Sequence, residues 1–194
     1  MIAIAGGKGG CGKTTSTVGL ARSTPEATII IDADITLPNL SARAGAPQAS
    51  SSTLTRSIDP DDTTTIIETP QSKSQLQSRL AQLETAQEMV YIDCPAGATP
   101  AAAIPLRFAS AIIAITTPTT ASITDTLKTI TMATTLKAPC LGVMCVKTTE
   151  HDHSVADCFE SPLLSVVPFD PAPLRSTQVH LAFKQAISNL YQYV

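Results

Sequence analysis

A glycine-rich segment directly after the first apolar run of the chain limits the folds open to it more than any other feature. Residues 7–14 read Gly-Lys-Gly-Gly-Cys-Gly-Lys-Thr and match the pattern G-x-x-x-x-G-K-[ST] in full. Glycines at this spacing let consecutive backbone N–H groups turn inward around phosphate oxygens, and the N-terminus of a following helix adds a partial positive charge. The segment therefore predicts a phosphate-binding loop between a strand at Ile2–Ala5 and a helix at Lys13–Ser23.

The phosphate-binding loop also indicates which ligand it binds. In loops of this pattern the lysine, here Lys13, supplies a point charge to the β- and γ-phosphates, and the next hydroxyl, here Thr14, is a ligand for Mg²⁺. The sequence contains no N-K-x-D guanine signature, so ATP or ADP with Mg²⁺ is the expected ligand. The loop residues expected at the nucleotide are Gly7, Lys8, Gly9, Gly10, Cys11, Gly12, Lys13, Thr14 and Thr15.

Short apolar runs alternate with longer helical patterns along the chain. Most of the runs are unbroken, as expected for strands that are covered on both faces. Strands are expected at 2–5, 28–31, 65–67, 89–92, 111–116, 141–146 and 163–167, and helices at 13–23, 74–85, 100–109, 123–137 (behind a cap at Ser122) and 177–193. Because this alternation implies right-handed crossovers, we predict a doubly wound α/β fold with a mostly parallel sheet and helices on both faces.

Two polar segments interrupt the alternation. Residues 45–64 are rich in Ser, Thr, Pro and Asp and predict an exposed loop with at most a short helix, and residues 148–162 predict a second loop. The second loop contains His151, His153 and Cys158, but this spacing matches no common zinc site, so a solvated loop is favoured over a metal centre. We find no repeat or linker, and a single domain over residues 1–194 is expected.

Charge and composition exclude several classes of function. With 13 basic against 16 acidic residues, the net charge of −3 offers no overall attraction to nucleic acid or to an anionic membrane. No window approaches 18 apolar residues, the cysteines include no C-x-x-C pair, and the last helical pattern carries a single basic residue, Lys184. We therefore expect a cytoplasmic protein with neither a nucleic-acid partner nor a direct membrane anchor, and with its last helix packed on the sheet.

A second lysine within the loop, Lys8, and further motifs along the chain resemble the MinD/ParA family of P-loop ATPases. In that family the corresponding lysine reaches across a dimer interface to the nucleotide of the partner. The resemblance therefore implies an ATP-bound homodimer, whose catalytic geometry is complete only when two copies meet. It covers nearly the whole chain and implies catalytic roles for Lys8, Lys13, Asp34 and Asn39.

The acidic motifs of the family follow at the ends of two predicted strands. In the pattern D-x-D-x-x-x-x-N-L, the resemblance implies that Asp34 and Asn39 position the attacking water and that Asp32 supports the Mg²⁺ shell. Asp93 ends a second strand and would hold the metal. Carboxylates at the carboxyl ends of parallel strands lie in the crevice where such sheets bind ligands. Switch II would comprise Pro95, Ala96 and Gly97.

The second half of the chain both supports the resemblance and departs from it. Residues 116–125, TTPTTASITD, resemble a segment that favours MinD over its ParA cousins. Where the family usually has Asn-Arg to hold adenine, this chain has Val146 and Lys147. Lys147 can lie over a base as a cation, whereas Val146 offers no amide. The P-x-D element that contains Pro168 and Asp170 is kept, and we expect it at the base pocket.

The expected function is that of a MinD-like ATPase that dimerises on binding ATP-Mg²⁺. Slow hydrolysis would then serve as a switch for the spatial positioning of the division site or of other cellular structures. An activating or cargo protein is an implied partner. The changed pair Val146 and Lys147 also motivates an alternative, a nucleotide-binding regulatory module with little or no hydrolysis that acts through protein–protein interaction.

Overall fold

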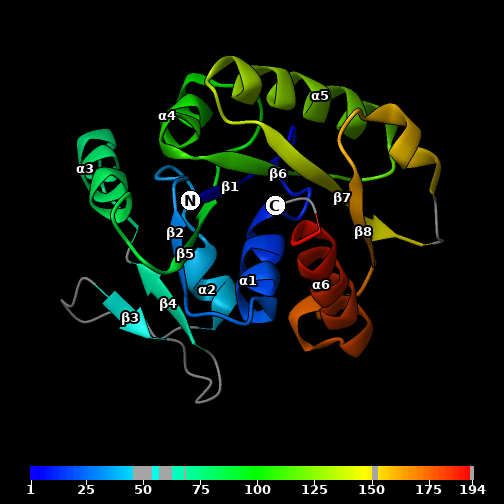
Figure 1. Cartoon of the computed structure of the whole chain (residues 1–194), viewed down its shortest axis with the longest axis horizontal. Coiled ribbons are helices and arrows are strands. Elements are labelled where there is room, and N and C mark those ends of the chain that lie inside the picture. Colours follow the sequence, from blue (N-terminus) through cyan, green and yellow to red (C-terminus); the bar gives the residue numbers. More distant parts are fainter. Residues whose placement is uncertain (46–53, 57–62, 68, 150–152, 193–194) are drawn as a thin grey trace.

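A single sheet joins the eight strands of the described residues, which are 1–45, 54–56, 63–67, 69–149 and 153–192 of the computed structural model (Figure 1). The strand order is β3-β4-β2-β5-β1-β6-β7-β8, and every neighbouring pair is parallel except β3 and β4. The predicted doubly wound, mostly parallel sheet is therefore confirmed. The strands are β1 (Ile2–Ala5), β2 (Thr28–Asp32), β3 (Leu54–Arg56), β4 (Thr64–Ile67), β5 (Met89–Asp93), β6 (Ala111–Thr116), β7 (Cys140–Thr148) and β8 (Leu163–Pro168).

Helices cover both faces of the sheet, and Figure 1 shows α4 and α5 above it and α1 and α6 below it. Buried side chains divide in the same way, because one hydrophobic cluster joins α1, α2 and α6 to the sheet and a second joins α3, α4 and α5. Every residue of β1 and β6 is buried, since both strands lie between the two helical layers. The helices are α1 (Lys13–Ser23), α2 (Leu40–Ala44), α3 (Lys73–Leu83), α4 (Pro100–Phe108), α5 (Thr120–Thr135) and α6 (Thr177–Leu190), with the 3₁₀ turns η1 (His153–Cys158) and η2 (Pro173–Arg175).

The last helix, α6, packs on the sheet as the sequence predicts. It buries one stripe of side chains against β8 and α1, namely Val179, Phe183, Ala186, Ile187 and Leu190. At the contact with α1, a Cβ placed on Gly19 would lie 2.2 Å from the Phe183 ring, so only glycine fits between the two helices. Within the described residues, no helix has the length and apolar character needed to cross a membrane.

Three expectations from the sequence are wrong in detail. In the segment expected to be a loop at 45–64, residues 54–56 form β3, which pairs antiparallel with β4, and β4 already begins at Thr64. The cap of α5 is Thr119, whose hydroxyl accepts from the Ser122 N–H at 3.3 Å. Ser122 instead closes the turn after β6, because its hydroxyl accepts from the Thr117 N–H at 3.0 Å.

The second expected loop, 148–162, begins inside β7 and contains η1. Of its candidate metal ligands, His151 lies outside the described residues, and His153 and Cys158 bound η1. Among the residues that the structure describes, no group of three or more His, Cys, Asp or Glu side chains is arranged to hold a metal ion.

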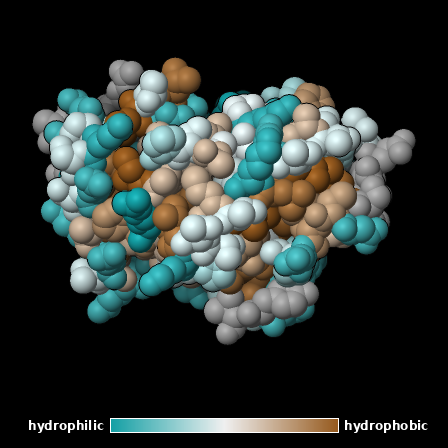
Figure 2. All heavy atoms as spheres, turned by 90° about the horizontal axis from the view of Figure 1, so that it is seen from above, coloured by the Kyte–Doolittle hydropathy of each residue, from teal (hydrophilic) through white to brown (hydrophobic). Residues whose placement is uncertain are grey.

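Figure 2 shows the face of the molecule on the α4 and α5 side, where hydrophobic side chains gather in patches among polar ones. Leu127 of α5 is 40% exposed. Three threonines of the same helix, Thr124, Thr131 and Thr135, donate their hydroxyl protons to the carbonyl four residues earlier, at 2.9, 3.0 and 2.8 Å. Because these hydroxyls are bonded within the helix, the outer face of α5 is less polar than its threonine content indicates.

Candidate nucleotide-binding site

The loop between β1 and α1 has the backbone of a phosphate cradle. Gly10 and Gly12 adopt left-handed conformations, with φ of +72° and +100°, which residues with side chains rarely adopt. A Cβ on Gly12 would also lie 3.1 Å from the Val146 Cγ2 atom. Lys13 begins α1 and is only 8% exposed, and its ammonium group bends back to donate to the Lys8 carbonyl at 3.1 Å. The buried ammonium group of Lys13 therefore lies next to the backbone of the loop itself.

Asp93 is a buried carboxylate beside this loop. It ends β5, is 3% exposed and accepts a hydrogen bond from the Thr17 hydroxyl of α1 at 3.4 Å. Burial raises the pKa of Asp93 to about 7, while a hydrogen bond from the Thr14 hydroxyl and the charge of Lys13 act in the opposite direction. A carboxyl group beside a hydroxyl, both at the end of a parallel sheet, supplies the oxygen ligands that Mg²⁺ prefers.

Asp32, at the end of β2, is buried and organises the next loop. One of its carboxylate oxygens accepts from the Asp34 N–H at 2.9 Å, and the other accepts from Asn39 and Leu40 at 2.9 and 3.1 Å. Burial raises the pKa of Asp32, and these three backbone donors oppose the shift. Asp32 therefore holds the segment that carries Asp34 and Asn39 and does not itself line the cavity described below.

The expected switch II segment contacts the phosphate-binding loop through backbone atoms. The Gly97 N–H donates to the Gly6 carbonyl at 2.9 Å, and Gly97 has a φ of +76°. On its other side, the loop lies against α5, because a Cβ on Gly7 would be 2.3 Å from the Asp125 carbonyl carbon. Gly6, Gly7 and Gly97 thus let the expected switch II segment, the loop and α5 approach one another closely.

One cavity of about 490 Å³ collects most of the predicted site residues from five separate segments. Because it opens beyond the carboxyl ends of the central strands, it occupies the usual ligand position of such sheets. The predicted residues that line it are Gly9, Gly10, Gly12, Lys13, Thr14, Thr15, Asp34, Asn39, Asp93, Ala96, Lys147 and Asp170. The predicted residues that do not line it are Gly7, Lys8, Cys11, Asp32, Pro95, Gly97 and Pro168.

A smaller apolar pocket of about 60 Å³ adjoins the cavity between β7 and β8. Val146, Val167 and Pro168 line it, together with the ring of Phe169. Lys147 stands at its entrance in a left-handed backbone conformation with a φ of +60°, and its ammonium group donates to the Gly10 carbonyl. Of the expected base-pocket residues, the structure therefore brings Lys147, Pro168 and Asp170 together.

Sequence reasoning missed several residues that line the larger cavity. Two of them are large, exposed hydrophobic side chains at its rim, Leu37 (71% exposed) and Phe169 (61% exposed). Leu37 lies inside the pattern D-x-D-x-x-x-x-N-L and Phe169 inside the P-x-D element. Their positions within these motifs could therefore have indicated that they line the site. Arg43 had no such signal, since it enters the site on the short helix α2, which the sequence did not predict. The other missed lining residues are Pro171 and Pro173, whereas Cys94, which the sequence places beside Asp93, lines the cavity as well.

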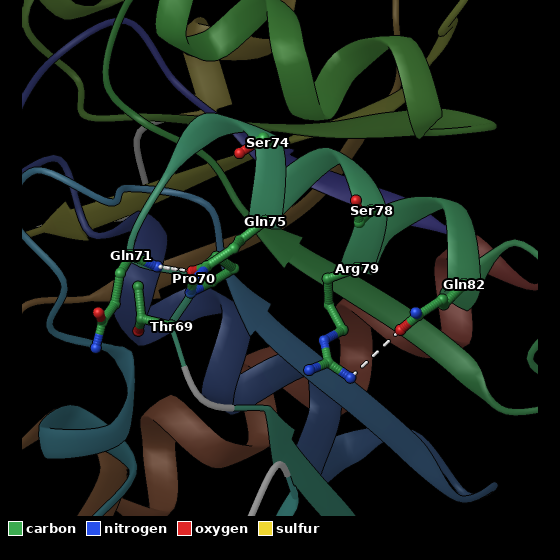
Figure 3. Close-up of a pocket in the computed structure, with 8 residues that line it drawn as sticks. All are labelled: Thr69, Pro70, Gln71, Ser74, Gln75, Ser78, Arg79 and Gln82. Atoms are coloured by element: carbon green, nitrogen blue, oxygen red, sulfur yellow. Dashed lines mark hydrogen bonds between the residues drawn. The ribbon is translucent and has the colours of Figure 1, made fainter.

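A separate cavity of about 510 Å³ lies along α3 and contains none of the predicted site residues (Figure 3). Three of its longer side chains, Gln75, Arg79 and Gln82, already have hydrogen-bond partners. Gln75 accepts from the Gln71 N–H at 2.9 Å, and Arg79 donates to the Gln82 side chain at 3.4 Å. The cavity on α3 is therefore a weaker candidate for a site than the one at the phosphate-binding loop.

The comparisons with known proteins agree with this geometry. Residues 2–181 match the model of the CobQ/CobB/MinD/ParA nucleotide binding domain. Since the match spans most of the chain, the chain belongs to this family. The resemblance that the sequence motifs indicate is thereby confirmed.

Individual relatives cover most of the chain as well. An uncharacterized ATP-binding protein from Methanocaldococcus jannaschii is 28% identical over 198 residues, which is 88% of this chain and 74% of the relative. The septum site-determining protein MinD of Pyrococcus horikoshii, complexed with Mg-ADP, has a TM-score of 0.85 at 22% identity, over 95% of this chain and 93% of that one. A chain of the MinC:MinD cell division protein complex of Aquifex aeolicus has a TM-score of 0.83 at 17% identity, over 98% and 95%. These two structures establish the fold.

Proposed function

We propose that this chain is a cytoplasmic Mg²⁺-dependent ATPase that dimerises on binding ATP and hydrolyses it as a switch for spatial positioning, with residues 1–194 acting as one domain. The observation that carries the proposal is the 490 Å³ cavity, in which the phosphate-binding loop, Asp34 and Asp93 converge at the carboxyl ends of the strands. The family membership and the ATP-binding relative support a nucleotide as the ligand. The positioning role follows the MinD proteins that share the fold.

The phosphate end of the cavity suits a nucleotide triphosphate with Mg²⁺. Gly9 and Gly10 face open space, so a phosphate can approach their backbone closely. Lys13 is expected to leave the Lys8 carbonyl for phosphate oxygens, which bind an ammonium group more strongly than a neutral carbonyl does. Thr14 and Asp93 would hold Mg²⁺, with Asp32 supporting its shell. When bound, the ion neutralises charge on the phosphates.

Asp34 and Asn39 are the residues we assign to the attacking water. Both line the cavity on the loop that Asp32 fastens through three backbone hydrogen bonds. An Asp34 oxygen now accepts from the Thr36 and Leu37 N–H groups at 3.3 and 3.1 Å. The carboxylate retains further lone pairs, so it can also accept a proton from a water or orient one.

The proposed dimer would close over the nucleotide. Lys8 is exposed on the outer side of the loop, where it can reach the nucleotide of a second copy. Leu37 and Phe169 expose apolar surface at the rim of the same cavity, which a second copy would bury. An activating or cargo protein is also proposed, since the related fold of Aquifex aeolicus occurs in a MinC:MinD complex. We assign no membrane anchor and no nucleic-acid partner.

Size-exclusion chromatography with light scattering tests the proposal, with the apo protein compared with Mg-ADP and Mg-ATP samples. We expect a dimer only with Mg-ATP, an Asp34→Ala variant that stays dimeric, and a Lys8→Ala variant that binds ATP as a monomer. Phosphate release is measured on the same samples. A nucleotide-dependent dimer without phosphate release would favour the regulatory-module alternative. A Lys13→Ala variant with unchanged ATP affinity would contradict the site itself.

A further inference from the structure

Arg43 is a basic residue that lines the cavity at the phosphate-binding loop, and the chemistry proposed so far gives it no role. It lies in the last turn of α2 and reaches the cavity from the same chain segment as Asp34 and Asn39. Because we assign those two residues to the attacking water, Arg43 enters at the end of the cavity where the terminal phosphate would react. It does not line the apolar pocket between β7 and β8.

The short helix α2 is fixed at both ends, and this directs the Arg43 side chain. The Asp32 carboxylate accepts from backbone N–H groups at its start, and the Ala44 carbonyl at its end accepts from the Arg22 guanidinium group at 3.1 Å. Leu40 and Ala44 are buried in the cluster that includes side chains of α1, and Figure 1 shows the two helices side by side. Because side chains on a helix lean toward its N-terminus, Arg43 is directed back toward the start of α2, which lies next to the cavity.

Arg43 is exposed, and its guanidinium group has no hydrogen-bond or ion-pair partner among the residues that the structure describes. The other two cations that line the cavity, Lys13 and Lys147, both donate to carbonyl groups of the phosphate-binding loop. Arg43 would therefore give up no bond to a described residue on binding a ligand, so its full donor capacity is open to a phosphate.

The charges around the cavity favour a further cation once a triphosphate is bound. A nucleoside triphosphate brings more negative charge than Mg²⁺ alone neutralises. A guanidinium group stays protonated and can donate two parallel hydrogen bonds to one phosphate group. The charged side chains that line the cavity are three acidic and three basic ones, namely Asp34, Asp93, Asp170, Lys13, Arg43 and Lys147. The side chains alone thus leave no excess of positive charge for the terminal phosphate, and each cation near it counts.

We propose, resting on the function proposed above, that Arg43 binds the terminal phosphate of ATP within its own chain and makes the site prefer ATP over ADP. This cation acts in cis, in contrast to Lys8, which we assign to the nucleotide of a second copy. Release of the terminal phosphate after hydrolysis would free Arg43, so this contact distinguishes the two nucleotide states.

Titration calorimetry with Mg-ADP and with the non-hydrolysable ATP analogue Mg-AMPPNP tests the preference, on the wild type and on Arg43→Gln. In the variant the dissociation constant for Mg-AMPPNP is expected to rise about tenfold, and that for Mg-ADP by less than about threefold. An unchanged affinity for Mg-AMPPNP, or an equal loss for both nucleotides, would overturn the proposal and leave the proposed function standing. If the wild type bound neither nucleotide, the proposed function would fall as well.

Two further variants test whether the charge at this position is responsible. Arg43→Lys keeps the positive charge without the pair of parallel donors, so its affinity for Mg-AMPPNP should lie between those of the wild type and Arg43→Gln. Arg107→Gln is the matched control, because Arg107 is also exposed in the last turn of a helix and lines neither cavity. It should alter neither affinity, and a loss as large as that of Arg43→Gln would contradict the assignment.

The Lys8→Ala background tests whether Arg43 acts within its own chain. Since that variant is expected to bind ATP as a monomer, dimerisation would not contribute to its affinity for Mg-AMPPNP. We expect Arg43→Gln to weaken Mg-AMPPNP about tenfold in this background as well, with light scattering to verify the monomer. Loss of the effect in the monomer would place Arg43 at the contact between two copies and overturn its assignment in cis.

Discussion

At the scale of single residues, buried charge marks the site. Among the described residues, the charged side chains that are buried are Lys13, Asp32 and Asp93, and all three belong to the phosphate-binding loop or to a strand end beside it. Burying a charge costs free energy unless it is paired, and none of these three forms a close ion pair with another residue that the structure describes. We infer that these three charged side chains serve to bind a ligand, and that their burial lowers the free energy of unfolding.

The first prediction concerns Asp93 in the absence of nucleotide and Mg²⁺. Because burial raises its pKa from 3.8 to about 7, the folded chain holds this proton more tightly than the unfolded chain does. The stability contributed by the protonated carboxyl is therefore lost as the pH rises from about 4 to about 7. Asp93→Asn should raise the free energy of unfolding by about 2–4 kcal/mol at pH 8 and by less than half as much at pH 5.

Chemical denaturation at the two pH values, in EDTA, measures this difference. Asp157→Asn, at an exposed aspartate of η1, is the control and should change little at either pH. If the Asp93→Asn variant were no more stable than the wild type at pH 8, burial of the charged Asp93 carboxylate would not lower the stability of the folded chain.

Motif spacing predicts most of these residues from the sequence alone. Lys13 and Thr14 follow from the loop pattern, the resemblance to the family implies the roles of Asp34 and Asp93, and the strands bring these four residues to one cavity. The bond from Lys147 to Gly10 was not predictable, since it depends on a left-handed backbone at a lysine and on a partner 137 residues away.

At the scale of elements, the site forms where the backbones of three chain segments come into close contact. The phosphate-binding loop touches switch II through Gly6 and Gly97, and it touches α5 through Gly7. Because the glycines bring these backbones close together, a shift in one backbone acts directly on the next.

The second prediction tests this junction with Gly7→Ala. The added methyl group would lie 2.3 Å from the Asp125 carbonyl carbon and 2.5 Å from the Thr126 nitrogen, which are backbone atoms that cannot rotate away. We expect a loss of about 3 kcal/mol in the free energy of unfolding, measured by urea denaturation. Gly9→Ala is the matched control, because its Cβ meets nothing within 4 Å, and it should stay within about 0.5 kcal/mol of the wild type. Equal midpoints for the two variants would contradict the close contact.

The elements that the sequence failed to predict are short. β3 has three residues and α2 has five, too few for a period of two or of 3.6 residues to stand out. Both depend on partners outside their own short segment: β3 pairs with β4, and the start of α2 is held by Asp32. The long strands and helices are predictable, because the spacing of their apolar residues indicates whether one or both of their faces are buried.

At the scale of the whole molecule, ligand binding and folding are coupled. The cavity is lined by residues from β1–α1, β2–α2, the end of β5, the end of β7 and the end of β8, so the site exists only in the folded chain. A ligand that binds only the folded state stabilises it by mass action.

The third prediction follows from this coupling. Mg-ADP at about 100 times its dissociation constant should add about 2.7 kcal/mol and raise the melting temperature by roughly 5–10 °C. ADP in EDTA should raise it less, and Lys13→Ala should remove the shift. Differential scanning fluorimetry measures all three, and a shift retained in Lys13→Ala would place the nucleotide elsewhere.

The position of β1 in the sheet has a consequence for the synthesis of the chain. Ile2 of β1 pairs with Tyr91 of β5 and with Ala111 of β6, and both of these strands are synthesised long after β1. β2 and β4, which are neighbours in the sheet, can pair with each other much earlier. β1 must therefore wait, unpaired and apolar, until β5 and β6 have been made. Until then no phosphate cradle exists, and nucleotide can assist only the last stage of folding.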